Sequence, residues 1–480
     1  MRSLLTTLLV LALAACASPG ERAAPPAQET APASLAAARS LAGAPAGEWP
    51  AERWWTAFGD PQLDALIDEA LGASPTLAMA SARIRRAQAL IEAAVARGGY
   101  DLTGALDVTR QRFTATGIYP PPLAGSTQTT AQLSVNFAYE LDYAHRNDAA
   151  IAAAHAEAFA AGADAYAARL ALASGLARGY FQLQGLFALR EVDRSELAQR
   201  EKLVGLTRRR VAAGLDTEAQ LARAQAAPPV LRAQLAQLEG AIALARNQIA
   251  ALAGKGPDRG LALEPAAARD AGPGVPQALA LDLLGRRPDL AAARWRAEAA
   301  SRGVEVAKAQ FMPNVNLVAF AGLSSLGLDK LLEARSTIVG AGPAVRLPLF
   351  STAGLRASLR GREADYDLAV EQYNALLVDA VREVADQVQA RRAIENEGRE
   401  LKAALDAVQR AYDLALARYK AGVSDLLSVL DAEGALFTER RAEADLRARA
   451  LQSDAALYRA LGGGYQEQAG NGTTDHRSKQ

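Results

Sequence analysis

Side chains that could perform catalysis are scarce in this chain of 480 residues. It contains three histidines and one cysteine, and His145, His155 and His476 belong to no cysteine or carboxylate constellation that suggests catalysis or metal binding. Neither a His/Cys metal centre nor a catalytic triad can be assembled from this set. Residues 254–257 lack the first half of a phosphate-binding loop and are typical of a helix-ending turn. We therefore expect no catalytic residue, no metal site and no cofactor, and predict that the chain is not an enzyme.

The single cysteine, Cys16, has a chemistry of its own. The apolar run at residues 4–14 is too short to cross a bilayer and has the form of a signal-peptide core. Residues 13–16 read Leu-Ala-Ala-Cys, which resembles the lipobox of bacterial lipoproteins, where the chain is cleaved before the cysteine and the cysteine is acylated. An ordinary signal peptide with an incidental cysteine is the alternative. Because Ala17 is not the aspartate that typically retains such proteins at the inner membrane, we expect Cys16 to carry palmitate at the outer membrane.

Composition excludes two further classes of protein. The 53 Lys and Arg residues are balanced by 53 Asp and Glu residues, whereas a nucleic-acid binder normally needs a basic surface. Half of the residues are hydrophobic, which excludes a disordered chain. Long stretches rich in Ala, Leu, Arg, Glu and Gln are typical of long helices. After Cys16 no run approaches eighteen uncharged apolar residues, so we expect no membrane-spanning helix.

The elements that position these residues are very long helices, interrupted by two pairs of strands. Helical patterns cover residues 62–97, 145–212, 217–253, 277–311, 354–420 and 424–461. Alternation with a period of two predicts strands at about 101–113, 129–142, 313–323 and 337–350. A helical run of about 67 residues would be roughly 100 Å long. The predicted fold is therefore mainly α with four two-faced strands.

Two apolar stripes along the helices indicate packing seams rather than ligand contacts. One comprises Leu231, Leu235, Leu238, Ile242, Ala245, Ile249 and Leu252, and the other Tyr373, Leu377, Val381, Val384 and Val388. Pro228-Pro229 violates the first pattern and should kink or interrupt its helix.

The chain is interpreted as an internal duplication. Residues 75–100 overlay on 288–313, and the helix–helix turn at 211–216 matches that at 420–424. In each turn a glycine ends one helix, and Asp216 or Ser424 starts the next, with Thr217 and Gln220 in capping-box spacing. The predicted segments are a signal peptide at 1–15, a lipid-anchored Pro/Ala-rich linker at 16–48, repeats at 49–265 and 266–464, and a disordered tail at 465–480.

The strands have the length and alternation of transmembrane β-strands. Four strands cannot close a barrel, and an open edge is not tolerated in lipid. The barrel must therefore be shared between chains. Two chains would give eight strands with a filled interior, whereas three would give twelve and room for an open lumen.

From about residue 49 to 464, the chain resembles the TolC-like outer-membrane efflux channels, in the lipoprotein branch that partners resistance-nodulation-division (RND) pumps. The resemblance rests on these motifs: Trp54-Trp55-Thr56-Ala57-Phe58-Gly59-Asp60-Pro61, Arg286-Arg287-Pro288-Asp289-Leu290, Phe311-Met312-Pro313-Asn314-Val315, Leu347-Pro348-Leu349-Phe350, Arg418-Tyr419-Lys420-Ala421-Gly422, Leu430-Asp431-Ala432 and Ala460-Leu461-Gly462-Gly463-Gly464.

The resemblance implies a homotrimer whose twelve-strand β-barrel continues as a long α-helical barrel. It also implies passive export of small molecules, drugs or toxic compounds, with a periplasmic adaptor (membrane fusion) protein and a proton-driven inner-membrane RND pump as partners. Two alternatives remain: the outer-membrane duct of a type I protein secretion system, favoured less by the lipobox and Trp54-Trp55, and a periplasmic coiled-coil structural lipoprotein.

The resemblance also implies the functional residues. The adaptor-docking tips map to Val211, Gly214, Leu215, Asp216, Thr217, Gly422, Val423, Ser424 and Asp425, and the periplasmic gate maps to Leu427, Asp431 and Tyr419. Leu427 and Asp431 are four residues apart and share a helix face. Three symmetry-related carboxylates would repel one another, so we expect gating to respond to pH or cations. Without the resemblance, Asp431 reads as a solvated helix-face carboxylate. Gly434 replaces a common arginine, which predicts a weaker or differently wired closing network.

Overall fold

A computed structural model describes Arg22 and residues 25–42, 46–266, 274, 285–348 and 352–467. Cys16 and the predicted signal peptide lie outside the described residues. The chain divides into two compact units. The sheet unit comprises the described residues of 1–29, 83–161 and 293–373, and the helix unit those of 30–82, 162–292 and 374–480.

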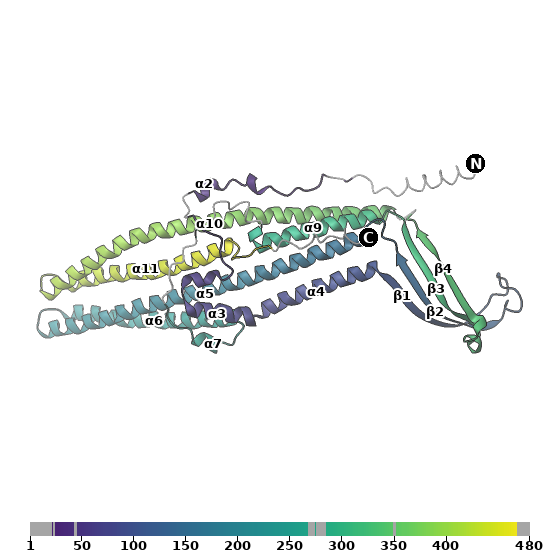
Figure 1. Ribbon diagram of the computed structural model, residues 1–480. Helices are drawn as coiled ribbons and strands as arrows, with labels where there is room; N and C mark the ends of the chain where they lie inside the picture. Colours follow the sequence, from purple (N-terminus) through teal and green to yellow (C-terminus); the bar gives the residue numbers. More distant parts are fainter. Residues whose placement is uncertain are drawn as a thin grey trace. The chain divides into compact units, whose positions relative to one another are not determined.

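The four strands form one antiparallel sheet in chain order (Figure 1). They are β1 (Tyr100–Arg112), β2 (Thr127–Glu140), β3 (Asn314–Leu326) and β4 (Thr337–Arg346). The four predicted strands are confirmed, and the pairing of β2 with β3 joins the two predicted repeats. β4 ends earlier than the predicted residue 350, because Pro348 has no N–H to donate to a ladder.

The register of the sheet groups side chains by polarity. Leu106, Leu133 and Leu323 lie side by side across three strands, and Phe137 lies on the same face two rows further along. The opposite face carries polar rows, of which one comprises Asp107, Gln132 and Ser324. Leu106 is 62% exposed although it is a large apolar side chain. The sheet thus has an apolar face, whose large side chains the described residues leave exposed, and a more polar face, which also carries Val318 and Phe320.

The main helices agree with the predicted runs in all but a few places. They are α3 (Pro61–Ala73), α4 (Pro75–Gly98), α5 (Arg146–Ala212), α6 (Glu218–Leu252), α7 (Asp258–Leu261), α9 (Pro288–Ala309), α10 (Thr352–Lys420) and α11 (Leu426–Ala460). The single run predicted at 62–97 is wrong, because Ser74 is extended and separates two helices. Pro75 causes this break by disfavouring the helical conformation of the residue before it. The first residues of the run predicted at 277–311 lie outside the described residues.

α6 continues through Pro228-Pro229, so an interruption of the helix is wrong, whereas a kink there stays a prediction. Pro228 is buried, and tertiary packing of the apolar face supplies most of a helix's stability in proteins, which offsets the two missing N–H donors. The predicted seam is confirmed, since every member from Leu231 to Leu252 is buried or half-buried.

The core of the helix unit is built around the tryptophan motif. Trp54 and Trp55 are buried in the short helix η2 (Trp54–Phe58). Trp54 stacks on Tyr458 with ring centroids 5.1 Å apart, and Phe58 packs against Phe181 at 4.7 Å. The first contact joins η2 to α11, and the second joins it to α5.

Segments at both ends of the folded body contact its helices. The segment predicted as a linker is hydrogen-bonded to α10: the Thr30 N–H donates to Asn374 Oδ1 (2.7 Å), and Gln389 Nε2 donates to the Ser40 carbonyl (2.7 Å). Tyr465, predicted to begin a disordered tail, is buried beside Ala163. Both segments are held because backbone amides and a large aromatic ring find partners on the helices.

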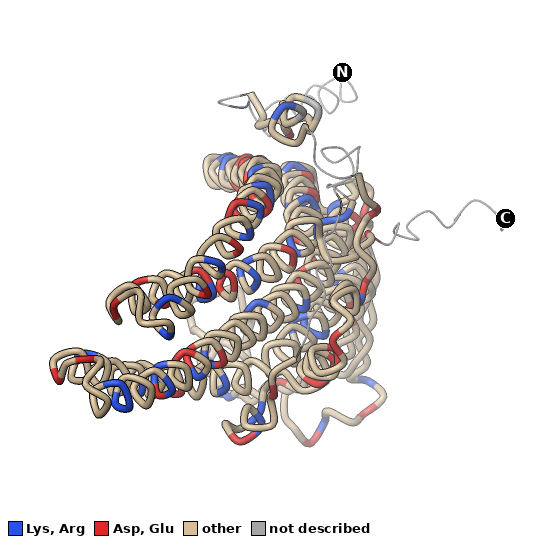
Figure 2. The backbone as a smooth tube through the Cα atoms, turned by 90° about the vertical axis from the view of Figure 1, so that its left-hand side faces the viewer, with Lys and Arg blue, Asp and Glu red and all other residues tan. Residues whose placement is uncertain are grey.

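Charges are interspersed along the helices, with basic and acidic residues alternating rather than gathering on one side (Figure 2). Among the described residues, no helix combines the length and apolar character needed to cross a membrane.

Candidate functional site

The two predicted tips are turns with the same backbone geometry. In the α5–α6 turn (residues 213–217), the Leu215 N–H donates to the Arg210 carbonyl at 2.8 Å and the Gly214 N–H to Val211 at 2.9 Å. In the α10–α11 turn (residues 421–425), the Val423 and Gly422 N–H groups make the equivalent bonds at 2.9 and 3.0 Å. Gly214 and Gly422 have φ of +69° and +74°, a conformation that glycine adopts without the steric cost of a Cβ.

The capping box expected at Thr217 and Gln220 is present, whereas Asp216 and Ser424, predicted to start the next helices, each lie one residue before the N-cap. Thr217 and Gln220 form the capping box, with each side chain accepting from the other residue's N–H. Asp425 Oδ1 accepts from the Ser428 N–H at 3.1 Å. Asp216 does not start α6 because its carboxylate is engaged elsewhere, and Asp425 replaces Ser424 at the start of α11.

Tyr419 joins the two helix pairs. Its hydroxyl donates to Asp216 Oδ2 at 2.5 Å and lies 3.2 Å from Thr207 Oγ1. Arg210 donates from Nε to the same carboxylate oxygen at 3.0 Å and lies over the Tyr419 ring at 4.6 Å. Tyr419 and Thr207 are fully buried. The end of α10 is thereby fastened to the α5–α6 turn.

The electrostatics of this link favour an ionised Asp216. Burial opposes its charge, but the hydrogen bonds from Arg210 and Tyr419 outweigh burial and hold the pKa of the carboxyl below its usual value. Burial, followed by the hydrogen bond to Asp216, raises the pKa of Tyr419, so its hydroxyl stays a donor at neutral pH.

The other predicted gate residues lie apart from this link. Leu427 is 45% exposed, and Asp431 is exposed on the same side of α11. Leu426 and Val429, in contrast, pack with Tyr419 in a buried cluster. α11 therefore uses one face to hold its neighbours and presents Leu427 and Asp431 on another.

The most exposed apolar side chains of the tips are Leu215 (65%) and Val423 (67%), one in each turn. Sequence reasoning missed Arg210 and Thr207 as members of the site. The sequence could have indicated Arg210 by its position in the last helical turn before Gly214, because the Asp216 carboxylate that follows the glycine folds back onto it.

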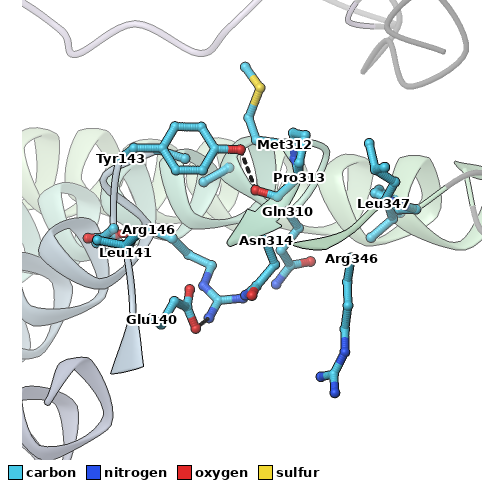
Figure 3. Close-up of a pocket in the computed structure, with 15 residues that line it drawn as sticks. Glu140, Leu141, Tyr143, Arg146, Gln310, Met312, Pro313, Asn314, Arg346 and Leu347 are labelled. Carbon is cyan, nitrogen blue, oxygen red and sulfur yellow. Dashed lines mark hydrogen bonds and ion pairs between the residues drawn. The ribbon is translucent and has the colours of Figure 1, made fainter. Parts of the chain in front are cut away.

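The sheet unit contains a cavity of about 360 Å³, where the ends of β2, β3 and β4 meet helical segments (Figure 3). Arg146 donates to Glu140 at 2.6 Å, and the Tyr143 hydroxyl donates to the Pro313 carbonyl. Asp142 accepts from two backbone N–H groups at the start of α5. Because these polar groups hydrogen-bond to neighbouring elements, we interpret the cavity as part of a structural junction rather than as a site for acid–base catalysis. Within the described ranges, no group of three potential ligands could hold a metal ion.

Comparisons with known proteins agree with this arrangement. The model of the outer membrane efflux protein family matches residues 66–255 and 279–463. The chain is 34% identical over 358 residues to the fusaric acid resistance protein FusA of Burkholderia cepacia, covering 74% of this chain and 68% of that protein. It is 31% identical over 429 residues to the multidrug resistance outer membrane protein MdtP of Escherichia coli strain K12, covering 87% of each. The crystal structure of the outer membrane protein VceC from Vibrio cholerae matches with a TM-score of 0.81 at 37% identity, over 87% of this chain and all of that one. The resemblance seen in the sequence is confirmed, and the chain belongs to the outer membrane efflux protein family.

Proposed function

We propose that three copies of this chain form an outer-membrane duct that passively conducts small toxic molecules out of the cell. The observation that carries this proposal is the two-faced sheet, in which the described residues leave the large side chains of the apolar face exposed and the other face is more polar. Within the described residues, β1 and β4 each pair on one side only. If β4 of one copy pairs with β1 of the next, the backbone groups at both open edges gain hydrogen-bond partners. The apolar face would then lie in lipid and the polar face around a lumen.

The cargo and the partners follow from the family and from the tips. Two relatives carry resistance to fusaric acid or to multiple drugs in their names, which supports small-molecule cargo. In the proposed assembly the duct conducts passively, and an inner-membrane RND pump would drive transport. Leu215 and Val423 give the two tips apolar contacts suited to a periplasmic adaptor. The lipid on Cys16 would add a second attachment to the outer membrane.

The gate combines a lock and a constriction. The Tyr419–Asp216 bond is the lock, because it holds α10 to the α5–α6 turn. Leu427 and Asp431 form the constriction, because their exposed face of α11 would meet its symmetry mates around the axis of a trimer. Arg210 supplies the guanidinium group of the lock. This agrees with the expectation of a differently wired closing network, because position 434 is glycine instead of the common arginine.

Single-channel conductance in planar bilayers tests the duct and its gate together. Wild-type protein should give small currents that divalent cations reduce, and Asp431→Asn should give larger currents that cations affect less. Asp445→Asn, an exposed position further along α11, is the matched control and should behave as wild type. Equal currents in all three would remove Asp431 from the gate while leaving the duct. No current despite verified insertion would contradict the duct itself.

A further inference from the structure

Five charged side chains cluster where α5 meets α11 in the helix unit. α5 contributes Asp193, Glu196 and Arg200, and α11 contributes Glu433 and Arg441. Glu433 is fully buried, and the three residues of α5 are less than a tenth exposed. Ionised groups are rarely buried unless they are paired and hydrogen-bonded, so the pairing within this cluster decides what it does.

The pairing is uneven. Arg441 donates from Nε to Asp193 Oδ1 at 2.7 Å and also bonds Glu196. Arg200 lies 3.6 Å from Glu196 and places Nη1 3.0 Å from Glu433 Oε2, without the alignment of a hydrogen bond. Neither carboxyl oxygen of Glu433 has a hydrogen-bond partner within the described part of the chain. Glu433 is thus the buried carboxyl whose charge is least satisfied.

Counting charges gives the same result. Three carboxylates face two guanidinium groups, so the fully ionised cluster carries one excess negative charge in a buried contact. Tyr412 approaches from α10 and adds no charge, because burial raises the pKa of its hydroxyl. One proton would balance the cluster.

We infer that this cluster is a proton-binding site, in which Glu433 takes up one proton when α11 packs against α5 and releases it when the two helices separate. Burial supports the assignment, since it raises the pKa of Glu433 to about 7, with Arg200 lowering it and Glu196 raising it. The proton converts the carboxylate into a neutral group, which costs less to keep away from water.

The direction of the pH effect follows from linkage. The packed contact binds the proton more tightly than the separated helices, where Glu433 would return towards its ordinary value of 4.5. The stabilisation is therefore complete below that ordinary value and is lost as pH rises through about 7. α11 also carries Leu427 and Asp431. If these residues form the gate, as the proposed function holds, rising pH would loosen the helix that bears it.

Backbone hydrogen exchange of the full-length protein, followed by mass spectrometry, tests the site. Exchange in α11 around Glu433, corrected for the intrinsic effect of pH, should report an opening constant that rises roughly 25-fold between about pH 5.5 and 8. In Glu433→Gln, which carries a permanently neutral isostere, the corrected exchange should not change with pH. Glu443→Gln places the same change at an exposed position of α11 and should retain the wild-type pH dependence.

A second variant keeps the test decisive if Glu433→Gln folds poorly. Glu196→Gln leaves two carboxylates against two guanidinium groups without any proton, so the midpoint of the pH dependence should move to lower pH. A flat wild-type profile, or an unchanged midpoint in Glu196→Gln, would overturn the inference. Because exchange requires no current, failure of this site and failure of the proposed duct are separately visible.

Discussion

Tyr419 shows how one hydroxyl can couple two helix pairs. Its bond to Asp216 closes a path from α10 to the α5–α6 turn, and Arg210 completes that path from the other side. The carboxylate is the shared acceptor, so both donors depend on its ionised state.

Replacing Tyr419 by Phe should weaken the lock without a large change in volume. Loss of a buried hydrogen bond to a charged group should lower the free energy of local unfolding at the tips by about 1.5–3 kcal/mol. The pKa of Asp216 should also rise, since one of the bonds that lowers it is gone. Because a depressed pKa gives stability that is lost as pH falls, the mutant tips should open at a higher pH on acidification.

Hydrogen exchange at the two turns measures this effect. Tyr412→Phe, at a buried tyrosine of α10 that does not bond Asp216, is the control and should leave the tips unchanged. Unaltered protection in Tyr419→Phe would show that Arg210 alone holds the lock.

Asp60 carries a second buried hydrogen-bond pair, in the core of the helix unit. Its Oδ1 caps α3 by accepting from the Gln62 N–H at 2.9 Å, and its Oδ2 accepts from the Tyr180 hydroxyl at 2.6 Å. Tyr180→Phe should therefore destabilise the protein by about 1–3 kcal/mol, because Asp60 is 3% exposed and loses a donor. Thermal unfolding checks this, with the exposed Tyr166→Phe as control. Equal melting temperatures would mean that water replaces the hydroxyl.

The helices end where their sequences specify, and glycine conformation is the reason at the tips. Gly422 has open space around the position of a Cβ, so only its positive φ resists substitution. Gly422→Ala should therefore destabilise the turn by about 1–2 kcal/mol. Gly240, also without neighbours but inside α6, should respond in the opposite direction, and Gly240→Ala should stabilise by about 0.5–1 kcal/mol. Chemical denaturation of the two variants measures both signs. A loss of stability in both would indicate contacts with another chain at position 240.

The assembled molecule depends on the sheet having two different faces. Leu133 lies in the apolar row with Leu106, and its chain neighbour Gln132 lies in the polar row with Asp107. In the proposed trimer, Leu133→Arg would place a charge in lipid, at a cost of about 2–4 kcal/mol near the bilayer midplane. Gln132→Arg would face the lumen beside a carboxylate.

We expect Leu133→Arg to reduce the amount of trimer in outer-membrane fractions severalfold and Gln132→Arg to leave it near the wild-type level. Semi-native electrophoresis of the membranes gives both amounts. If Gln132→Arg were the damaging change, the two faces of the sheet would have to be exchanged.

The features that depend on neighbours in sequence were predictable. Period-two alternation located β1 to β4, and the glycine and Thr217 located the α5–α6 turn, because strand alternation, a positive φ and a capping box are all local properties. Contiguous sequence motifs likewise predicted the family and its helix-rich fold. The position of the lipid and the roles of Leu427 and Asp431 stay predictions.

The remaining features arise from contacts between distant parts of the chain. The Tyr419–Asp216 bond, the burial of Glu433 against Arg200 and the continuity of α6 through Pro228 are not encoded in local patterns. In each case a segment from elsewhere in the chain supplies the partner or excludes the water. Only packing fixes which polar side chains meet, because a charged residue on a helix has the same local signature whether it faces solvent or another helix.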